Sequence, residues 1–261
     1  MTVFAGVRSR EAGEALRQQG GERLIPIPLD VTDPESIRQA ETVVRETVGL
    51  AGVSGLVNNA GIAVGSPLEV IPIDALRRQL EVNVIGQVLI TQAFLPLIRL
   101  ARGRIVNMGS IAGRGTIPVM GPYSASKHAL EALTDALRLE LQPWGLHVSI
   151  IEPGAVATPI WEKSTKVGDE IAASAGPAAL ALYGELVARV KDRVAQSARR
   201  AISPDVVAHM VLHALTATKP KTRYLVGSDA KIRALMLRWL PDRAHDWILT
   251  KVLALPGWNT K

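Results

Sequence analysis

The segment GPYSASKHALEAL at residues 121–133 places a phenol and an ammonium group where they could exchange a proton. Tyr123 and Lys127 are four residues apart, and Pro122 stands at the first turn of the predicted helix, so both side chains share one helix face. A phenol with a pKa of about 10 is a poor base near neutrality, but a nearby ammonium favours the phenolate. The pair could therefore move the proton of a substrate hydroxyl. Taken alone, this spacing is more typical of a packed tyrosine and a solvated lysine.

Three further polar features lie at predicted strand ends or inside a helix. Ser110 ends the strand-like run GRIVNMGS, NNAG at 58–61 ends another, and Asn83 lies in a long helical pattern that disfavours asparagine. Sites in open α/β sheets are built at the carboxyl ends of strands. Each feature also has a simpler interpretation: Ser110 as a helix cap, Asn-Ala-Gly as a turn and Asn83 as a polar residue facing solvent. Their occurrence together favours a catalytic site.

Short apolar runs alternate with longer helical patterns along the whole chain. Several of these runs are rich in Val and Ile without polar alternation, as strands buried on both faces require. The predicted strands are 3–7, 24–29, 53–58, 104–108, 147–151 and 224–226, and the predicted helices are 10–19, 34–48, 74–101 and 122–142. This order predicts an α/β fold, a doubly wound and Rossmann-like parallel sheet with right-handed crossovers, in a single domain over residues 1–261.

The predicted domain has three parts. Residues 1–157 carry the candidate cofactor-binding and catalytic residues, and residues 204–261 form a sheet edge and the C-terminal helices. Between them, residues 158–203 form an Ala-rich helical insertion that Gly176 and Pro177 interrupt. Because this insertion follows a strand, at the edge of the sheet where ligands bind, we expect it to be a substrate lid.

The composition excludes several classes of protein. The 261 residues are 48% hydrophobic and 21% charged, as in an ordinary globular domain. Cysteine is absent, which excludes disulfides and a thiol nucleophile, and we expect no metal because His209 and His213 have no third ligand in view.

The net charge of +6 is spread without a basic cluster longer than a pair such as Arg199-Arg200, and aromatic residues are only 4%, which argues against nucleic-acid binding. No uninterrupted apolar run is long enough to span a bilayer, and we expect a cytoplasmic protein.

Together the motifs resemble the short-chain dehydrogenase/reductase family, from Val3 to about Gly227. The matching features are Asp30-Val31, NNAG at 58–61, Asn83, Ser110, Tyr123, Lys127, and Pro153-Gly154 followed by Thr158. The resemblance implies an NAD(P)-dependent oxidoreductase that interconverts an alcohol and a carbonyl. It further implies that Tyr123 transfers the proton, that Ser110 orients the substrate oxygen, and that Asn83 anchors a water linked to Lys127. A nucleotide-binding methyltransferase, a rival with alternating strands and helices, would not explain Ser110, Tyr123 and Lys127 together.

The resemblance also implies where the cofactor binds. It places Asp30 and Val31 at the adenine, Asn58, Ala60 and Gly61 along the ribose and phosphates, and Ile151, Pro153, Gly154 and Thr158 on the nicotinamide side, which Tyr123 and Lys127 also reach. At the end of the family's second strand, an acidic residue favours NAD, whereas an arginine accommodates the 2′-phosphate of NADP. This chain has Arg8 there and no carboxylate before Glu11. We therefore predict NADP, bound at Arg8, with NAD as the alternative.

The family normally has one more strand and a TGxxxGxG turn before the strand that VFAGVR matches here. In a sheet of order 3-2-1-4-5-6 that strand is the central one, so we expect unpaired edges on the strands at 3–7 and 53–58. We expect the sequence as it stands to bind cofactor weakly and to be poorly soluble, and a polypeptide extended upstream by about thirty residues to be active. The alternative function is a truncated, catalytically impaired relative that acts as a non-catalytic or unstable chain.

Apolar residues after the predicted catalytic part bear on the substrate and the partners. The insertion with Trp161 and the stretch at 234–258 favour a small hydrophobic alcohol or ketone, such as a steroid, a retinoid or a long-chain alcohol. Ordinary core and dimer contacts explain the same residues equally well. The stretch at 234–258 could also touch a membrane surface without crossing it. The resemblance implies a homodimer or homotetramer that associates through the helices at 74–101 and 122–142.

Overall fold

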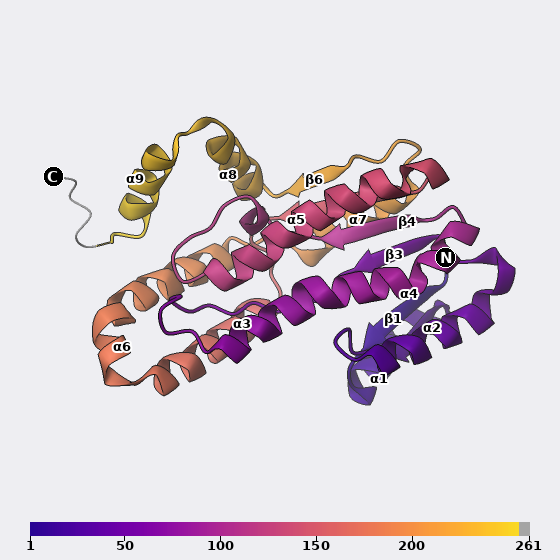
Figure 1. Ribbon diagram of the computed structural model, residues 1–261, viewed down its shortest axis with the longest axis horizontal. Helices are drawn as coiled ribbons and strands as arrows, with labels where there is room; N and C mark the ends of the chain where they lie inside the picture. Colours follow the sequence, from indigo (N-terminus) through magenta and orange to yellow (C-terminus); the bar gives the residue numbers. More distant parts are fainter. Residues whose placement is uncertain (256–261) are drawn as a thin grey trace.

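The structure, a computed structural model, describes residues 1–255 (Figure 1). Its strands are β1 (Val3–Val7), β2 (Leu24–Pro28), β3 (Gly55–Asn58), β4 (Arg104–Met108), β5 (His147–Pro153) and β6 (Arg223–Val226). Its longer helices are α1 (Arg10–Gly20), α2 (Pro34–Val48), α3 (Ile73–Leu80), α4 (Gly86–Leu100), α5 (Gly121–Leu141), α6 (Ile160–Arg199), α7 (Pro204–Thr216), α8 (Ser228–Trp239) and α9 (Asp242–Val252). The predicted elements lie at these positions, with ends that differ by one or two residues.

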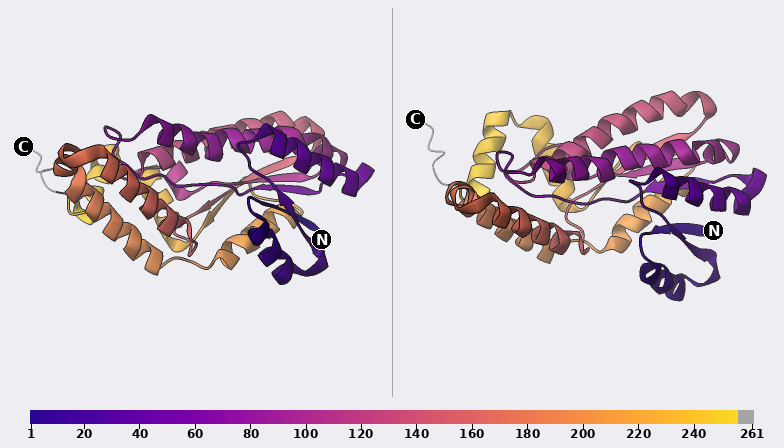
Figure 2. Two further views of the ribbon diagram at one scale, coloured as in Figure 1. Left: turned by 90° about the horizontal axis from the view of Figure 1, so that it is seen from below. Right: turned by 60° about the horizontal axis from the view of Figure 1, so that its bottom comes forward.

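The strands form a central layer between two layers of helices (Figure 2). Helices α2, α4 and α5 cover one face of this layer, whereas α1 and α7 cover the other. Every strand pair is parallel, and the side chains of Ile98, Ile105 and Ile150 are completely buried in the core. Helices on both faces of a parallel sheet define the doubly wound class, so the predicted fold is confirmed.

The strands are divided between two sheets. Strands β3, β4, β5 and β6 pair in that order, and β1 pairs with β2 in a separate two-stranded sheet. Within residues 1–255, no strand bridges β1 and β3. One edge of each therefore lacks a strand neighbour, as expected for the strands at 3–7 and 53–58.

Local sequence signals fix where several helices begin. Ser9 and Asp33 cap α1 and α2, because their side chains accept hydrogen bonds from the Ala12 and Glu35 amides at 3.2 and 2.9 Å. Pro34 and Pro204 stand at the starts of α2 and α7, where a missing amide hydrogen is harmless. These caps orient each crossover helix as it leaves its strand.

The helix predicted over 74–101 is not continuous. Helix α3 is separated from α4 by a π-helical turn, η3 (Glu81–Ile85), with Asn83 in the turn. A π-turn inserts an extra residue into the helical spacing, and such turns occur often at functional sites. The irregularity explains how a residue with poor helix propensity is accommodated in this long segment.

The C-terminal half of the chain surrounds the carboxyl ends of the strands. In Figure 1, α6 folds back on itself at one end of the molecule, and α8 and α9 lie above it. The fold-back occurs at Gly176, whose φ of 80° and ψ of 176° break the helix as the Gly176-Pro177 pair predicted. Of the apolar stretch at 234–258, residues 256–258 lie outside the described residues.

Two helical segments are long and apolar enough to cross a membrane by length and composition alone. The first, Ile73–Leu100, is half buried inside the protein, where it covers the sheet and contacts α5. The second, Ile160–Arg199, is largely exposed and is interrupted at Gly176. Both segments contain polar residues, so neither is an uninterrupted apolar run, and the absence of a membrane-spanning helix stays a prediction.

Candidate active site

A cavity of about 910 Å³ lies at the carboxyl ends of β4 and β5. Its walls come from the loops after β3, β4 and β5 and from α5, α6, α7, α8 and α9. The predicted site residues that line it are Gly61, Ser110, Tyr123, Lys127, Pro153, Gly154 and Thr158. The structure therefore brings together residues from four separate parts of the sequence. The predicted residues Arg8, Asp30, Val31, Asn58, Ala60, Asn83 and Ile151 are not in the cavity wall.

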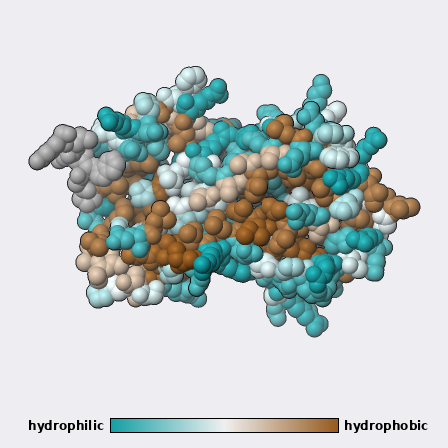
Figure 3. Space-filling model, in the orientation of Figure 1, coloured by the Kyte–Doolittle hydropathy of each residue, from teal (hydrophilic) through white to brown (hydrophobic). Residues whose placement is uncertain are grey.

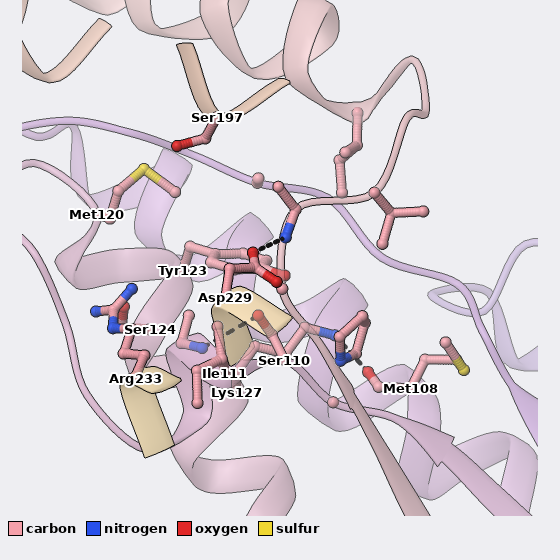
Figure 4. Close-up of a pocket in the computed structure, with 18 of the residues that line it drawn as sticks. Met108, Ser110, Ile111, Met120, Tyr123, Ser124, Lys127, Ser197, Asp229 and Arg233 are labelled. Atoms are coloured by element: carbon pink, nitrogen blue, oxygen red, sulfur yellow. Dashed lines mark hydrogen bonds between the residues drawn. The ribbon is translucent and has the colours of Figure 1, made fainter. Parts of the chain in front are cut away.

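Ser110 lies where β4 passes into the single turn η4 (Ile111–Gly113). Its hydroxyl accepts a hydrogen bond of 3.1 Å from the Ala112 amide and so caps that turn. The same side chain is buried and lines the cavity, as Figure 4 shows. The capping interpretation is confirmed, and the functional one stays a prediction that the cap does not oppose, because the capping hydroxyl accepts a hydrogen bond and keeps its own proton to donate.

Tyr123 and Lys127 project from the first turns of α5 into the cavity (Figure 4). The Lys127 Nζ atom lies 5.8 Å from the centre of the Tyr123 ring. It also donates a hydrogen bond of 2.6 Å to the carbonyl oxygen of Met108, the last residue of β4. The lysine is buried rather than solvated. The alternative interpretation of this pair, a packed tyrosine beside a solvated lysine, is therefore wrong for the lysine.

Burial changes the acid-base properties of this pair. Removal from water raises the pKa of the Tyr123 phenol, and the Ser110 hydroxyl partly opposes that rise. Burial also lowers the pKa of Lys127 to about 8, against the pull of the Glu131 carboxylate. The lowered phenol pKa expected from the sequence is not found, because the cost of burying a phenolate is the largest effect on this pKa.

Asn83 belongs to a row of buried polar side chains. Gln79, Asn83, Gln87 and Thr91 recur every four residues along α3, η3 and α4, and all are buried. The Asn83 side chain accepts from the Ile62 amide at 2.9 Å and donates to the Ile62 carbonyl at 3.0 Å. Asn83 thus faces the core and not solvent. It stands beside Gly61, since a Cβ placed on that glycine would lie 3.5 Å from Asn83 Oδ1 and 3.9 Å from Lys127 Nζ.

The rest of this row holds the loop that follows β3. Gln79 accepts from the Val64 amide at 2.7 Å, and Gln87 donates to the Ala60 carbonyl. Thr91 accepts from the side chain of Asn58 at 2.9 Å. Side chains from one helix therefore satisfy backbone groups at several successive loop positions, so the NNAG loop has a defined shape beside the cavity.

Asn58 itself points into the core. Its side-chain amide donates to Thr91 and to Asn107 on β4, both at 2.9 Å, and Asn107 donates to Thr134 of α5 at 2.8 Å. This chain of hydrogen bonds ties β3, β4 and the helices on one face together. The predicted ribose and phosphate contact of Asn58 is not carried by a side chain that projects into the cavity, because that side chain is used within the core.

The residues expected at the adenine lie apart from the cavity. Asp30 accepts hydrogen bonds from the amide and hydroxyl of Thr32 at 2.9 and 2.7 Å, and these bonds hold its pKa below the usual range. The cationic Arg78 and Arg8 lower that pKa further, which places Arg8 within electrostatic reach of Asp30. Val31 packs against α4 at a position where any Cβ on Gly86 would collide with it.

Sequence reasoning missed several residues of this site. Ser126 accepts from the Asn83 side chain at 3.0 Å, and Gln79 and Gln87 share the loop-holding role of Asn83. Their signal was available, since polar residues four apart inside an apolar helix mark a buried polar row. Asp229 and Arg233 line the cavity from α8. Nothing near them in the sequence indicated that α8 folds back over the strand ends.

A cluster of buried charges lies behind Lys127. Glu152 is fully buried at the end of β5 and accepts two hydrogen bonds from Arg114, at 2.9 and 2.8 Å. Glu131, one turn beyond Lys127 on α5, accepts from Arg223 at 3.1 Å. Burial, followed by the nearby Glu152 carboxylate, raises the pKa of Glu131 to about 8. Glu131 therefore keeps its proton in the folded protein where an exposed carboxyl would lose it.

This raised pKa predicts how stability depends on pH. The unfolded chain releases the Glu131 proton near the ordinary pKa of 4.5, whereas the folded chain retains it to about 8. The contribution of Glu131 is therefore full below 4.5 and is lost as the pH rises to about 8. We expect Glu131→Gln to flatten the fall of Tm across this range, in thermal denaturation followed by circular dichroism. Glu140→Gln, at an exposed position of α5, is the control, and an equal slope in both variants would contradict the assignment.

The geometry of the site agrees with the comparison to known proteins. A family model described as short chain dehydrogenase matches residues 1–168. The chain belongs to the short-chain dehydrogenase/reductase family. As a member, it is an oxidoreductase that interconverts alcohol and carbonyl groups. The family membership predicted from the motifs is confirmed.

Several curated relatives cover most of this short-chain dehydrogenase/reductase. An NADPH-dependent 3-dehydrocapnine reductase of Ornithobacterium rhinotracheale is 36% identical over 96% of this chain and 88% of its own. Retinol dehydrogenase 5 of Mus musculus is 39% identical, over 98% of this chain and 82% of its own. A 17-beta-hydroxysteroid dehydrogenase type 6 of Bos taurus has the same identity and coverage.

Solved structures of the family share the architecture. A short-chain dehydrogenase from Streptomyces avermitilis superposes with a TM-score of 0.74 and 29% identity, over 98% of this chain and 89% of its own. A short chain dehydrogenase from Burkholderia cenocepacia, in complex with NADP, gives a TM-score of 0.72 and 26% identity, over 95% of this chain and 86% of its own. The doubly wound fold is thus found in experimental structures of related sequence.

Proposed function

We propose that this protein uses NADP to interconvert a hydrophobic alcohol and the corresponding ketone or aldehyde, with Tyr123 as the proton-transferring residue. The observation that carries the proposal is the meeting of Ser110, Tyr123 and Lys127 in one cavity at the strand ends. NADP dependence agrees with the NADPH-dependent relative and with the NADP complex of a related structure. The family match does not favour the alternative of a non-catalytic chain.

In the reductive direction, the Tyr123 hydroxyl donates its proton to the substrate carbonyl oxygen as that oxygen gains negative charge. Ser110 donates a second hydrogen bond to the same oxygen and so fixes the position of the carbonyl. Bound NADPH supplies the hydride. Lys127 stabilises the phenolate that remains, because its Nζ atom lies beside the Tyr123 ring. Asn83 holds the loop through Ile62 and so acts by positioning.

Residues of the cavity and of the end of β1 fit the two ends of the proposed cofactor. On the nicotinamide side, Gly61 and Gly154 bring bare backbone to the cavity, and Pro153 and Thr158 lie next to them. A Cβ on Gly154 would come 2.1 Å from the Asp229 carboxylate, so this approach requires glycine. On the adenine side, Arg8 follows β1 and supplies an exposed cation for a 2′-phosphate.

Replacing Arg8 tests the choice of cofactor. A guanidinium that pairs with the 2′-phosphate contributes to NADPH binding and not to NADH binding. In Arg8→Ala we expect the dissociation constant of NADPH to rise about tenfold or more, until it approaches that of NADH. Fluorescence titration with each nucleotide measures both constants. The control is Arg10→Ala, which removes a neighbouring exposed arginine that pairs with Glu14. An undiminished preference for NADPH in Arg8→Ala would contradict the role of Arg8.

The cavity wall supports a hydrophobic substrate. Most of the side chains around the catalytic residues are apolar, and they include Ile111, Ile117, Met120, Trp161, Val207, Ile248 and Leu249. The names of the retinol and hydroxysteroid dehydrogenases among the relatives point to the same class of alcohol. Oxidation of NADPH with a panel of steroid, retinoid and alkyl ketones tests the proposal. The proposal fails if the folded, NADPH-binding protein reduces none of them.

Three expectations about the lid, the assembly and the location of the protein complete the proposal. Residues 158–203 act as the lid, since Trp161 and the far end of α6 line the cavity. The protein associates as a homodimer or homotetramer through α3 to α5, where Figure 3 shows hydrophobic residues on the surface and where Ile73, Leu100 and Leu139 are more than half exposed. It resides in the cytoplasm, and exposed Trp239 and Trp247 on α8 and α9 allow contact with a membrane surface.

A further inference from the structure

One buried ion pair lies beside Ser110 but outside the cavity. Glu152 is completely buried near the end of β5, and Arg114 directly follows the turn η4 that Ser110 caps. The Arg114 guanidinium donates to both carboxylate oxygens of Glu152, from Nε at 2.9 Å and from Nη2 at 2.8 Å. Within residues 1–255, the cavity wall includes neither partner. The pair can therefore act on the site only through other residues.

The ion pair joins two strands at the point where their hydrogen-bonded pairing stops. Strands β4 and β5 pair as far as Met108 and Ile151, and Glu152 is the next residue of β5. Beyond Met108, the chain leaves β4 and forms the segment that carries Ser110 and η4 and reaches Arg114. A fork of two charge-assisted hydrogen bonds fixes both distance and orientation. Arg114 thus holds the far end of this segment, where backbone pairing between the two strands no longer does.

Glu152 is the fixed end of the pair. It lies opposite Leu225 of β6 in the sheet, and its side chain is fully enclosed. The Arg114 side chain is 33% exposed, and η4 is a single turn of three residues. A turn this short has few hydrogen bonds of its own, so an anchor at its end decides where it lies.

The turn η4 in its place determines where the Ser110 hydroxyl lies. Ser110 accepts from the Ala112 amide through its side chain at 3.1 Å and from the Gly113 amide through its carbonyl at 2.8 Å. Gly113 also lies close against α5, because a Cβ added there would come 3.0 Å from the Lys127 carbonyl oxygen. A shift of η4 would therefore move the Ser110 hydroxyl relative to the helix that carries Tyr123 and Lys127.

The free energy of the pair does not by itself explain its presence. A buried ion pair contributes little net stability, because the loss of hydration of both charges offsets their attraction. The neighbouring residues Ile150 and Ile151 of β5 are completely buried and apolar, so a charge at position 152 is costly there. The feature that the site can use is the fixed geometry of the fork.

We propose that Arg114 and Glu152 are positioning residues, which hold η4 so that the Ser110 hydroxyl is aimed at the substrate carbonyl oxygen. The proposal rests on the proposed function, because it assumes that Ser110 donates to this oxygen. A displacement of about 1 Å in a catalytic group can lower turnover by as much as about 10²-fold. Loss of the fork should therefore lower kcat through Ser110, while the cavity and its cofactor-binding residues stay in place.

Arg114→Lys tests this role, because it keeps the cation and removes the fork. We expect kcat for a reactive ketone to fall about tenfold, with the dissociation constant of NADPH within about twofold of the wild-type value. In a Ser110→Ala background the same change should lower kcat by less than about twofold, since an absent hydroxyl cannot be misplaced. Glu152→Gln, which keeps the side-chain shape, should give the same two results. An equal loss in both backgrounds, no loss at all, or disagreement between the two variants would overturn the proposal.

A second arginine fork supplies the matched control. On α2, Arg45 donates to both carboxylate oxygens of the buried Glu41, each at 2.7 Å, and in the described part of the chain neither residue lines the cavity. Arg45→Lys removes a comparable fork away from the site, so we expect kcat within about twofold of the wild-type value. Far-ultraviolet circular dichroism verifies the fold of every variant. If Arg114→Lys does not fold, Glu152→Gln decides the outcome.

Hydrogen exchange separates this proposal from the proposed function, because it requires no turnover. Mass spectrometry of the purified protein should show faster amide exchange over residues 110–114 in Arg114→Lys than in the wild type, with unchanged exchange in β6. Unchanged exchange over 110–114 would overturn the positioning role. Faster exchange there, in a protein whose wild type reduces no ketone, would support the anchoring of η4 and refute only the reaction proposed for Ser110.

Discussion

Tyr123→Phe is expected to lower the turnover of NADPH-dependent ketone reduction by at least about 10²-fold, the usual contribution of one well-placed general acid. The substitution keeps the ring that packs beside Lys127 and deletes only the hydroxyl. Because the proton donor is lost while the cavity shape stays, kcat should fall much more than the substrate KM rises. Steady-state kinetics with a reactive ketone, at saturating NADPH, measures the two separately.

The same substitution at another tyrosine provides the control. Tyr183 lies on α6, outside the cavity wall, and its hydroxyl bonds to Glu69. Tyr183→Phe removes an equivalent hydroxyl, and we expect kcat within about twofold of the wild-type value because no proton transfer depends on it. A Tyr123→Phe protein that retains near-normal turnover would remove Tyr123 from the mechanism.

The positions of the strands and helices could be predicted because local rules decide them. Val- and Ile-rich runs form β4 and β5, and Asp33 with Pro34 begins α2 as capping rules require. That Ser110, Tyr123 and Lys127 line one cavity could be predicted because strand ends in a parallel sheet meet at one edge. Both inferences use information that lies within a short stretch of sequence.

Other features depend on contacts between distant segments and could not be read locally. The π-turn contains Asn83, whose side chain bonds to the loop at Ile62, and this contact joins segments 21 residues apart. The inward placement of Arg233 requires α8 to return over the strand ends. The high pKa of Tyr123 depends on how deeply the ring is buried, which spacing alone does not specify.

Lys127→Met is expected to lower activity strongly without lowering stability, so that the two roles of this lysine can be measured separately. The ammonium is buried, and its pKa is lowered from 10.5 to about 8 because charge is costly there. A pKa lowered by this much means that burial makes the charged form of the lysine less favourable by roughly 3 kcal/mol. Methionine fills a similar volume without a charge. The free energy recovered by removing the buried charge offsets the loss of the 2.6 Å hydrogen bond from Lys127 to the Met108 carbonyl. We therefore expect Tm to equal or exceed the wild-type value.

The activity of the same variant should fall by about 10²-fold or more, because Tyr123 loses the group that stabilises its phenolate. The pH dependence of stability gives an independent check. The folded wild-type protein releases the Lys127 proton near 8, whereas the unfolded chain holds it to 10.5, so this contribution to stability rises with pH between these values. Lys127→Met should lack that rise, and Lys231→Met, on the exposed surface of α8, should keep it. A large drop in Tm at neutral pH for Lys127→Met would show that the buried lysine stabilises the fold, and the proposed conflict between its charge and its surroundings would be wrong.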